Sequence, residues 1–498
     1  MQKNENIKNY VIVGGGTAGW ISAAILARTL HNTEHTITVI ESPNIPTIGV
    51  GEATIPSIVD MLEFLRIPLK DFILKTNATF KLGIKFVDWK EKNHHYWHQF
   101  GHIGNKVDAQ PFYQHWLKHQ FINPTFELTD FSPAIALAKQ NKFFIPDPKQ
   151  PSNLSKSAYA LHFDASLVAK YLTEYSTALN VKLIQAHVKD TLLDENGNIS
   201  QLTIDGHESI KGDFFIDCTG QSALLINKAL RVGYENWQHY LPVNKAVAAQ
   251  SELITPLSPY TESIAHEHGW RWRIPLQNRT GNGYVYCSDY CSDDEAIGLL
   301  KKNVPNIITE PRVISFTTGK RNKVWHKNCL AVGLSSGFLE PLESTSIYLI
   351  MKTMLNFVQS LPTKEMAEPT INEFNRLIDN EYYNIRDFII LHYCETKRTD
   401  SKFWQMWQNL AIPESLKTKL DLFKCQGRLY ENHYDLFASE SWYAVLEGMG
   451  VRPKSYDPII DKSLFDKIEK AFTESAKALQ INASKTLDHA EFIKRLKS

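Results

Sequence analysis

The chain has 498 residues, of which 43% are hydrophobic and 22% are charged, an ordinary globular composition that argues against disorder. Its 54 Lys and Arg residues balance its 54 Asp and Glu residues, so it offers no general attraction for nucleic acid. At roughly 100–200 residues per domain, this length predicts about two to four structural units.

The apolar runs and the cysteines indicate the compartment in which the protein is expected to work. No uninterrupted apolar run is long enough to cross a bilayer, and the 6 cysteines form no paired C-x-x-C motifs. The first apolar run stops in glycines, as expected for a strand entering a phosphate loop rather than for a signal peptide. We therefore expect a reduced, cytoplasmic protein that binds no metal, nucleic acid or membrane.

The first predicted elements form a βαβ unit. A strand at 10–13 leads into a glycine turn, a helix follows at 20–30, and a second strand at 36–40 ends at Glu41. The turn fits G-x-G-x-x-G, in which glycines permit a tight turn, close approach of a pyrophosphate and packing of helix on strand. A carboxylate at the end of the second strand can bind a ribose hydroxyl. The predicted dinucleotide ligands are Gly14, Gly16, Thr17, Ala18, Gly19 and Glu41.

Two later strands favour FAD, although the glycine motif alone does not distinguish FAD from NAD. Residues 214–220 read F-F-I-D-C-T-G and residues 329–333 read C-L-A-V-G, so each is an apolar strand ending in glycine. An extended flavin nucleotide crosses several such strand ends.

The remaining elements complete an α/β pattern. Asp164 is expected to cap a helix at 166–179, and from about residue 345 onward helices dominate, at 346–361 and 371–392. We predict a Rossmann-like FAD-binding module of the GR2 type over 1–360, with an excursion at about 91–150. A mostly helical, substrate-side module is predicted over 361–498.

Three motifs carry a resemblance to a known family. Residues 270–275 are W-x-W-x-I-P, residues 49–56 are G-V-G-E-A-T-I-P, and residues 340–345 are E-P-L-E-S-T. Together, and in the order in which the chain carries them, these motifs make the chain similar to the flavin-dependent halogenases of the tryptophan-halogenase type, from residue 11 to about 450. The resemblance implies an oxidoreductase that uses FADH2 from a separate flavin reductase, O2, a halide ion and a small aromatic substrate. It also allows a homodimer.

The resemblance assigns roles to two side chains. In that family, reduced FAD and O2 convert halide into hypohalous acid, which travels through a tunnel to a lysine near the substrate. By motif match in F-K-L-G-I-K-F that lysine is Lys81, acting either as an ammonium that binds the acid or as an amine that forms a haloamine. Glu343 matches the carboxylate that orients the acid and takes the ring proton. Lys85 and Glu340 are near in sequence but match no catalytic position.

The same resemblance places the halide at the backbone N–H groups of Thr345 and Ser346, where a helix is predicted to begin. Ser346 stands where the family commonly has glycine, so bromide and chloride both stay open, and a side chain there could alter the cavity and the backbone φ. Further FAD contacts are expected from a set of apolar residues on later elements. These are Ala53, Val188, Leu334 and Ile347.

The resemblance also places aromatic residues at the substrate end. The tunnel motif comprises Trp270, Trp272, Ile274 and Pro275, and the two tryptophan rings would keep an organic substrate away from the flavin. His98 and Phe100 resemble the H-x-F pair that sandwiches an indole ring.

The clamp that holds the charged ends of free tryptophan in this family has no clean counterpart in the chain. Its loosely placed candidates, which could equally be core residues, are Tyr430, Tyr434, Glu440 and Trp442. Free tryptophan is therefore disfavoured as substrate, whereas indole, another small aromatic or a larger tethered substrate all stay open.

Two other functions share the glycine motif. An FAD-dependent aromatic monooxygenase should lack W-x-W-x-I-P and does not need Lys81, and fold alone does not fix the chemistry. A non-catalytic FAD-binding protein would leave Lys81 and Glu343 unexplained. The sequence therefore predicts FADH2- and O2-dependent halogenation of an indole-type aromatic, with these two functions as alternatives.

Overall fold

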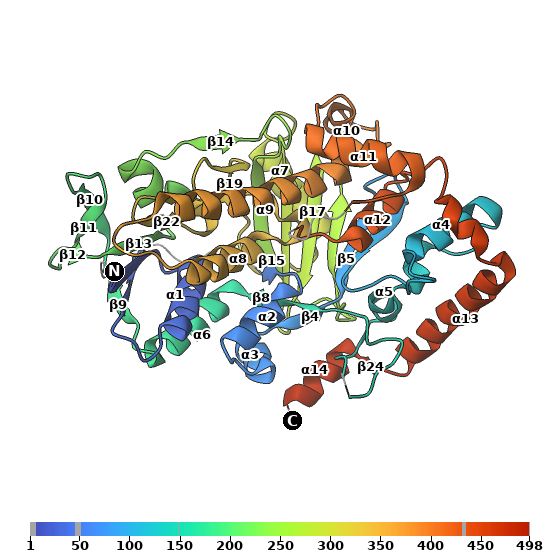
Figure 1. Cartoon of the computed structure of the whole chain (residues 1–498), viewed down its shortest axis with the longest axis horizontal. Helices are drawn as coiled ribbons and strands as arrows, with labels where there is room; N and C mark the ends of the chain where they lie inside the picture. The colour runs from blue at the N-terminus through green and yellow to red at the C-terminus, as the bar shows by residue number, and fades with distance from the viewer. Residues whose placement is uncertain (1–5, 45–50, 148, 431–434, 498) are drawn as a thin grey trace. The chain divides into compact units, whose positions relative to one another are not determined.

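The computed structural model describes residues 6–44, 51–147, 149–430 and 435–497, and the chain divides into two compact units (Figure 1). Each unit is assembled from three separate segments. The first unit comprises Met1–Asn77, Phe163–Gln238 and Phe316–Tyr383, and the second comprises Ala78–His162, His239–Ser315 and Asn384–Ser498. The long helix α9 (Glu368–Cys394) and the strand β8 (Ala160–Asp164) each contribute residues to both units.

The first unit is built on a six-stranded sheet in the order β21-β22-β13-β1-β2-β9. Its neighbouring strands are parallel except for the β21–β22 pair. The central strands β1 and β13 are buried along almost their whole length, as the apolar runs predict for parallel strands covered on both faces. The six strands are β1 (Asn9–Val13), β2 (Thr36–Glu41), β9 (Lys182–Gln185), β13 (Phe214–Asp217), β21 (Trp325–His326) and β22 (Cys329–Ala331).

Helix α1 (Thr17–Thr29) packs against both α6 (Ala165–Ala178) and α8 (Ser346–Gln359), as Figure 1 shows. Every residue of α1 from Gly19 to Ala27 is buried, and its small Ala and Ser side chains allow close packing. Asp164 caps α6 as predicted, because its carboxylate accepts hydrogen bonds from the backbone N–H groups of Ser166 and Leu167.

Shorter elements complete the first unit. Two three-stranded antiparallel sheets lie in it, one of β10, β11 and β12 and one of β14, β20 and β23. Their strands are β10 (Val188–Leu193), β11 (Ile199–Ile204), β12 (Ile210–Lys211), β14 (Tyr234–Asn236), β20 (Gly319–Arg321) and β23 (Gly337–Phe338). The remaining elements are β3 (Gly51–Ala53), α2 (Ser57–Phe64) and α3 (Leu69–Lys75).

The second unit is built on a seven-stranded sheet in the order β19-β15-β18-β17-β16-β5-β6. Only β5 and β16 pair in parallel; the other neighbours are antiparallel. The strands are β5 (Gly83–Val87), β6 (His95–Gln99), β15 (Lys245–Ser251), β16 (Thr261–Ala265), β17 (Gly269–Pro275), β18 (Thr280–Tyr286) and β19 (Arg312–Ser315).

Helices and three short strands surround this sheet within the second unit. The short strands are β4 (Thr79–Lys81), β7 (Lys142–Phe143) and β24 (Leu487–Asp488). The helices that lie wholly in this unit are α4 (Phe112–Ile122), α5 (Pro133–Ala138), α7 (Asp293–Asn303), α10 (Lys402–Trp407), α11 (Glu414–Gln426), α12 (Ser439–Gly448), α13 (Phe465–Ser484) and α14 (His489–Lys497).

These elements confirm the predicted α/β class with a Rossmann-like parallel sheet. Residues 361–498 are mostly helical, as predicted, but those after Tyr383 pack in one unit with the seven-stranded sheet. The predicted division into modules at residue 360 stays a prediction, while the two compact units interleave along the chain. Within the described ranges, no helix is both long and apolar enough to cross a membrane.

Candidate active site

The glycine turn of the first unit has the geometry of a phosphate cradle. Gly14 has φ +113°, and a Cβ there would lie 2.2 Å from the carbonyl oxygen of Cys218. A Cβ at Gly19 would lie 1.8 Å from the carbonyl oxygen of Gly14, so glycine permits the contact of helix and turn. A Cβ at Gly16 would meet no described atom within 4 Å. The backbone at Gly16 therefore borders open space, as a bound pyrophosphate requires.

The start of α1 and the end of β2 complete this cradle. Among the described residues, no side chain caps the first turn of α1, which holds Thr17 and Ala18, so its N–H groups suit an anion. The side chain of Glu41 lies against Gly15, since a Cβ there would be 2.4 Å from the Glu41 carboxyl carbon. Burial raises the pKa of Glu41, which fits a carboxylate held in a partly closed site. The residues present therefore fit a dinucleotide.

A buried carboxylate that was predicted only as the end of a strand organises the adjoining loops. Asp217 Oδ1 accepts from the backbone N–H and hydroxyl of Thr219 at 3.0 and 2.7 Å, and from the Ser335 hydroxyl at 3.1 Å. Its Oδ2 accepts from the N–H groups of Leu225 and Ile226 at 2.8 and 2.9 Å. These bonds fix the segments that follow β13 and β22. The D-C-T-G pattern in the sequence would have identified this carboxylate.

The four apolar residues expected to contact FAD lie on different elements of the first unit. Ala53 is buried on β3 and Ile347 is buried near the start of α8, whereas Val188 and Leu334 are half-buried. Leu334 follows Gly333, where φ is +70° and a Cβ would lie 2.8 Å from Cβ of Ala18. Leu334 is thereby next to the glycine turn.

The predicted halide loop turns sharply before α8. Glu343 is fully buried and ends a short 3-10 turn, Ser344 has a left-handed φ of 59°, and Thr345 precedes the helix. Ser346 is the first residue of α8, and no left-handed φ is found there. A glycine is therefore not required at position 346 by the backbone, and the serine adds a side chain without strain. Glu340 is buried as fully as Glu343.

In the second unit, Lys81 ends β4 and is fully buried. Its Nζ atom lies 5.1 Å from the centre of the Phe100 ring. A buried ammonium over an aromatic face is stabilised by the ring quadrupole. Lys85 differs: it is half-buried on β5, and its Nζ lies 4.0 Å from a carboxylate oxygen of Glu262.

An aromatic cluster adjoins Lys81 in the same unit. The His98 ring lies 6.2 Å from the Phe100 ring, 5.3 Å from the Phe388 ring and 5.8 Å from the Phe437 ring. Phe388 stacks on Phe437 at 3.9 Å and meets Trp442 edge-on at 5.0 Å. The cluster is His98, Phe100, Phe388, Phe437 and Trp442, all buried. Such rings suit a flat, electron-rich molecule.

The W-x-W-x-I-P motif lies on β17 and shares one sheet face with part of this cluster. Strand pairing aligns Trp272 with Ser263, Phe86 and Tyr96 in one row. Because strand side chains alternate, Trp270, Ile274 and His98 point to that same face. Trp270 is fully buried, with its ring 6.1 Å from that of Trp272. Pro275, the last residue of β17, is also buried.

Comparison with known proteins identifies the family. The family model described as "Tryptophan halogenase" matches residues 9–463. The chain belongs to the tryptophan halogenase family. The fold of this flavin-dependent halogenase agrees with that assignment, as does the fit of its glycine turn to a dinucleotide. Membership of the family implies that the enzyme uses FAD and O2.

Individual relatives match almost the whole chain. The chain is 34% identical to the tryptophan 6-halogenase SttH of Streptomyces toxytricini, over 95% of its own length and 96% of the relative's. It is 39% identical to BrvH, a flavin-dependent halogenase from Brevundimonas sp. BAL3, with a TM-score of 0.95 and coverage of 98% and 99%. Xcc4156, a flavin-dependent halogenase from Xanthomonas campestris, gives 38% identity, the same TM-score and coverage of 99% and 98%. These matches support halogenation over the two alternative functions, aromatic monooxygenation and non-catalytic FAD binding.

The clamp candidates of the halogenase are dispersed. Trp442 lies in the aromatic cluster, whereas Tyr430 is 67% exposed and Glu440 bonds to His102 over 3.2 Å. Tyr434 lies outside the described residues, as do Gly49 and Val50 of the G-V-G-E-A-T-I-P motif. In the part of that motif that is described, burial raises the pKa of Glu52 to about 7.

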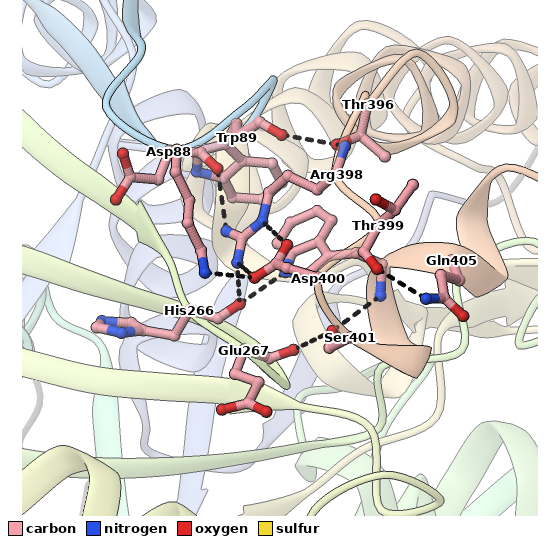
Figure 2. Close-up of polar contacts among 12 residues, drawn as sticks. Asp88, Trp89, His266, Glu267, Thr396, Arg398, Thr399, Asp400, Ser401 and Gln405 are labelled. Carbon is pink, nitrogen blue, oxygen red and sulfur yellow. Dashed lines mark hydrogen bonds and ion pairs between the residues drawn. The ribbon is translucent and has the colours of Figure 1, made fainter.

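An arginine for which no role was predicted connects several loops of the halogenase's second unit (Figure 2). Arg398 forms two hydrogen bonds with the Asp400 carboxylate, both of 2.9 Å, and donates to the carbonyls of Asp88 and His266 at 3.0 and 3.3 Å. The Trp404 indole N–H donates to the same His266 carbonyl at 2.7 Å. Arg398 therefore holds the loop after β5 and the turn between β16 and β17.

Proposed function

We propose that Lys81 is the catalytic lysine of this halogenase and that it delivers an electrophilic halogen to an aromatic substrate. The observation that carries the proposal is the burial of Lys81 beside the aromatic cluster. Its amino group is close enough to Phe100 that a ring bound among these side chains would lie near the amine. An ammonium that binds hypohalous acid and an amine that forms a haloamine both remain compatible with this arrangement.

Glu343, Thr345 and Ser346 are also proposed to take part in the reaction. Glu343 would orient the hypohalous acid and take the proton that leaves the substituted ring. The N–H groups of Thr345 and Ser346 would hold the halide at the start of α8. The buried position of Glu343 and the uncapped start of α8, judged on the described residues, support these roles.

FAD would lie on the glycine turn of the first unit and, in its reduced form, would supply the two electrons that bring O2 to the peroxide level, at which oxygen can oxidise halide. The residues proposed to hold it are Gly14, Gly16, Thr17, Ala18, Gly19, Glu41, Ala53, Val188, Leu334 and Ile347. We propose that a separate reductase supplies FADH2, since the sequence contains one glycine fingerprint. We also propose that the protein is cytoplasmic and that it forms a homodimer.

The preferred substrate would be indole or a similar uncharged aromatic. Bringing a zwitterion into an apolar site costs several kcal/mol unless polar partners replace its hydration. The cluster of His98, Phe100 and Trp442 offers ring faces, and the clamp candidates Tyr430 and Glu440 lie exposed or bonded elsewhere. Bromide should be preferred over chloride, because bromide is easier to oxidise and Ser346 alters the proposed halide site.

A turnover assay tests this function. The protein would be supplied with a flavin reductase, NADH, FAD and indole, in parallel with chloride, bromide and iodide, and the products would be analysed by mass. We expect brominated indole as the main product, and less product when free tryptophan replaces indole at equal concentration. Selective chlorination of tryptophan would contradict both the substrate and the halide proposals.

The need for a reductase is tested separately. FAD bound to the protein would be mixed with NADH or NADPH, and its absorbance followed without reductase. We expect the oxidised flavin spectrum to persist over the time of many turnovers. Rapid bleaching would show that the protein reduces its own flavin.

A further inference from the structure

The strand that carries Lys81 is short and depends on partners outside its sheet. β4 has three residues and pairs with β8 through Phe80–Leu161 and Lys81–Ala160. The backbone N–H of Phe80 donates instead to Nε2 of His489, at 3.0 Å. A side chain near the C-terminus therefore satisfies a backbone donor of the residue next to Lys81.

The hydrogen bonds of His489 define its protonation. Because Nε2 accepts from Phe80, it carries no proton, and Nδ1 donates to the carbonyl of Leu257 at 3.2 Å. The imidazole is fully buried, and burial lowers its pKa to about 4. At neutral pH it is therefore an uncharged ring in one tautomer, with both nitrogens engaged.

Aromatic packing fixes the same region. The Phe80 ring stacks on Phe143 at 3.9 Å and contacts Phe492 edge-on at 5.5 Å. β24 pairs with β7 through Leu487 and Phe143, just before His489 begins α14. Residues 487–492 thus hold both the backbone and the side chain of Phe80.

A second uncharged histidine contacts the other end of β4. His162 Nδ1 bonds to the Thr79 hydroxyl at 3.1 Å, and that hydroxyl donates to the carbonyl of Pro275 at 2.6 Å. The histidine must then be the donor to Thr79 and, through Nε2, the acceptor from the Thr261 hydroxyl at 2.8 Å. Burial, followed by the charge of Lys81, holds the pKa of His162 well below its usual range.

We propose that His489 is a positioning residue for Lys81, and that its imidazole, through the Phe80 N–H, is the contribution of helix α14 to the active site. The hydrogen bond from the Phe80 N–H to His489 fixes the position and direction of β4. It thereby fixes the position of the Lys81 amine over the Phe100 ring. This inference rests on the proposed role of Lys81. Misplacing a reacting group by about 1 Å can lower a rate by as much as 100-fold. If β4 is not held in place, hypohalous acid would therefore escape before it reacts with the substrate.

Three variants separate positioning from folding. His489→Leu removes the acceptor, whereas His489→Gln keeps a neutral oxygen that can accept from Phe80. Phe492→Leu is the matched control, because it loosens the same aromatic packing without touching the Phe80 N–H bond. Amide hydrogen exchange of residues 78–82 in FAD-free protein and the ratio of halogenated indole to trapped free hypohalous acid would both be measured.

We expect His489→Leu to speed exchange in residues 78–82 and to lower the product-to-free-acid ratio by at least about tenfold. His489→Gln and Phe492→Leu should stay within about threefold of wild type in that ratio, a difference below 1 kcal/mol. A wild-type ratio in His489→Leu, or an equal loss in Phe492→Leu, would overturn the inference. If Lys81→Ala halogenates normally, the proposed function itself fails; if Lys81→Ala is inactive and His489→Leu is normal, only the positioning role fails.

Discussion

The Nζ atom of Lys81 lies 5.1 Å from the centre of the Phe100 ring. Phe100 therefore contacts both the proposed catalytic amine and His98, whose ring centre lies 6.2 Å from that of Phe100. An amine over an aromatic face keeps its charge at a lower cost than an amine buried among aliphatic side chains. The same ring thus connects the proposed catalytic group to the proposed substrate site.

Replacing Phe100 should weaken halogenation without affecting flavin. In Phe100→Leu the ammonium loses its aromatic face, worth about 0.5–2 kcal/mol, so product formation should fall by roughly 2- to 30-fold. Product formation with indole and FAD affinity would be measured. Phe423→Leu is the control, because Phe423 is a buried ring that packs on Tyr113 away from this cluster. Equal losses in both variants would contradict the specific role of Phe100.

Replacing Ser346 by the glycine that the family commonly has should shift the halide preference. Ser346 lies in ordinary helical backbone, so Ser346→Gly removes a side chain from the proposed halide site without relieving strain. We expect the ratio of chlorinated to brominated indole to rise severalfold in a competition at equal halide concentrations. Ser344→Gly, at the left-handed residue two positions earlier, should leave the ratio unchanged. An unchanged ratio in Ser346→Gly would show that the Ser346 side chain does not influence which halide is used.

The Arg398 network should contribute to stability through the geometry of the guanidinium group, beyond the charge that a lysine would also carry (Figure 2). Lysine keeps the charge but cannot bond Asp400 in two places while reaching Asp88 and His266. Arg398→Lys should therefore lower the free energy of unfolding by about 1–3 kcal/mol at pH 7, as denaturant titration would show. A smaller loss than in an exposed control such as Arg376→Lys would count against this role.

The partner carboxylate gives that network a pH dependence. Hydrogen bonds from Arg398 hold the pKa of Asp400 well below its usual range. A lowered pKa means that the stabilisation is present above the unfolded pKa, near 3.8, and is lost as pH falls below it. We expect Asp400→Asn to be less stable than wild type at pH 7 and to approach wild type at the lowest pH that permits folding. A difference independent of pH would contradict this account.

His489 should destabilise the FAD-free protein in mild acid. Its pKa is about 4 in the folded protein, below the ordinary 6.5, so the unfolded chain binds the proton first. Stability from His489 is therefore complete above pH 6.5 and is lost as pH falls towards 4, by on the order of 3 kcal/mol. The pH dependence of unfolding would be compared in wild type and His489→Gln. Parallel curves between pH 6.5 and 4 would show that His489 does not titrate as described.

The sequence predicted the first unit well because its elements are local. A glycine turn after an apolar strand, Asp164 before an amphipathic helix, and buried strands ending in glycine each depend on neighbouring residues. Their bounds in the structure differ by only a few residues, as for α1, predicted at 20–30 and found at Thr17–Thr29. The glycine at position 14 has the left-handed φ that its motif requires.

The second unit was harder to predict. β18 reads T-G-N-G-Y-V-Y and is buried throughout, so it lacks the alternation that indicates a strand, and its first half contains Gly281, Asn282 and Gly283, which are rare in strands. The contacts of Phe80 with His489 and of Arg398 with Asp88 join residues hundreds of positions apart, which no local pattern encodes. The resemblance identified Lys81, but not the aromatic residues Phe388 and Phe437, which pack on His98 in the aromatic cluster.

The central claim is that Lys81 carries the halogen to the substrate, and Lys81→Ala tests it most directly. The variant would be supplied with reductase, NADH, FAD, bromide and indole, and three quantities would be measured: bound FAD, trapped hypohalous acid and brominated indole. Lys81 lies outside the glycine turn and the halide loop, so we expect wild-type FAD binding, undiminished hypohalous acid and no brominated indole. Lys85→Ala, which removes the neighbouring lysine paired with Glu262, should retain product formation. Wild-type bromination by Lys81→Ala would contradict the account.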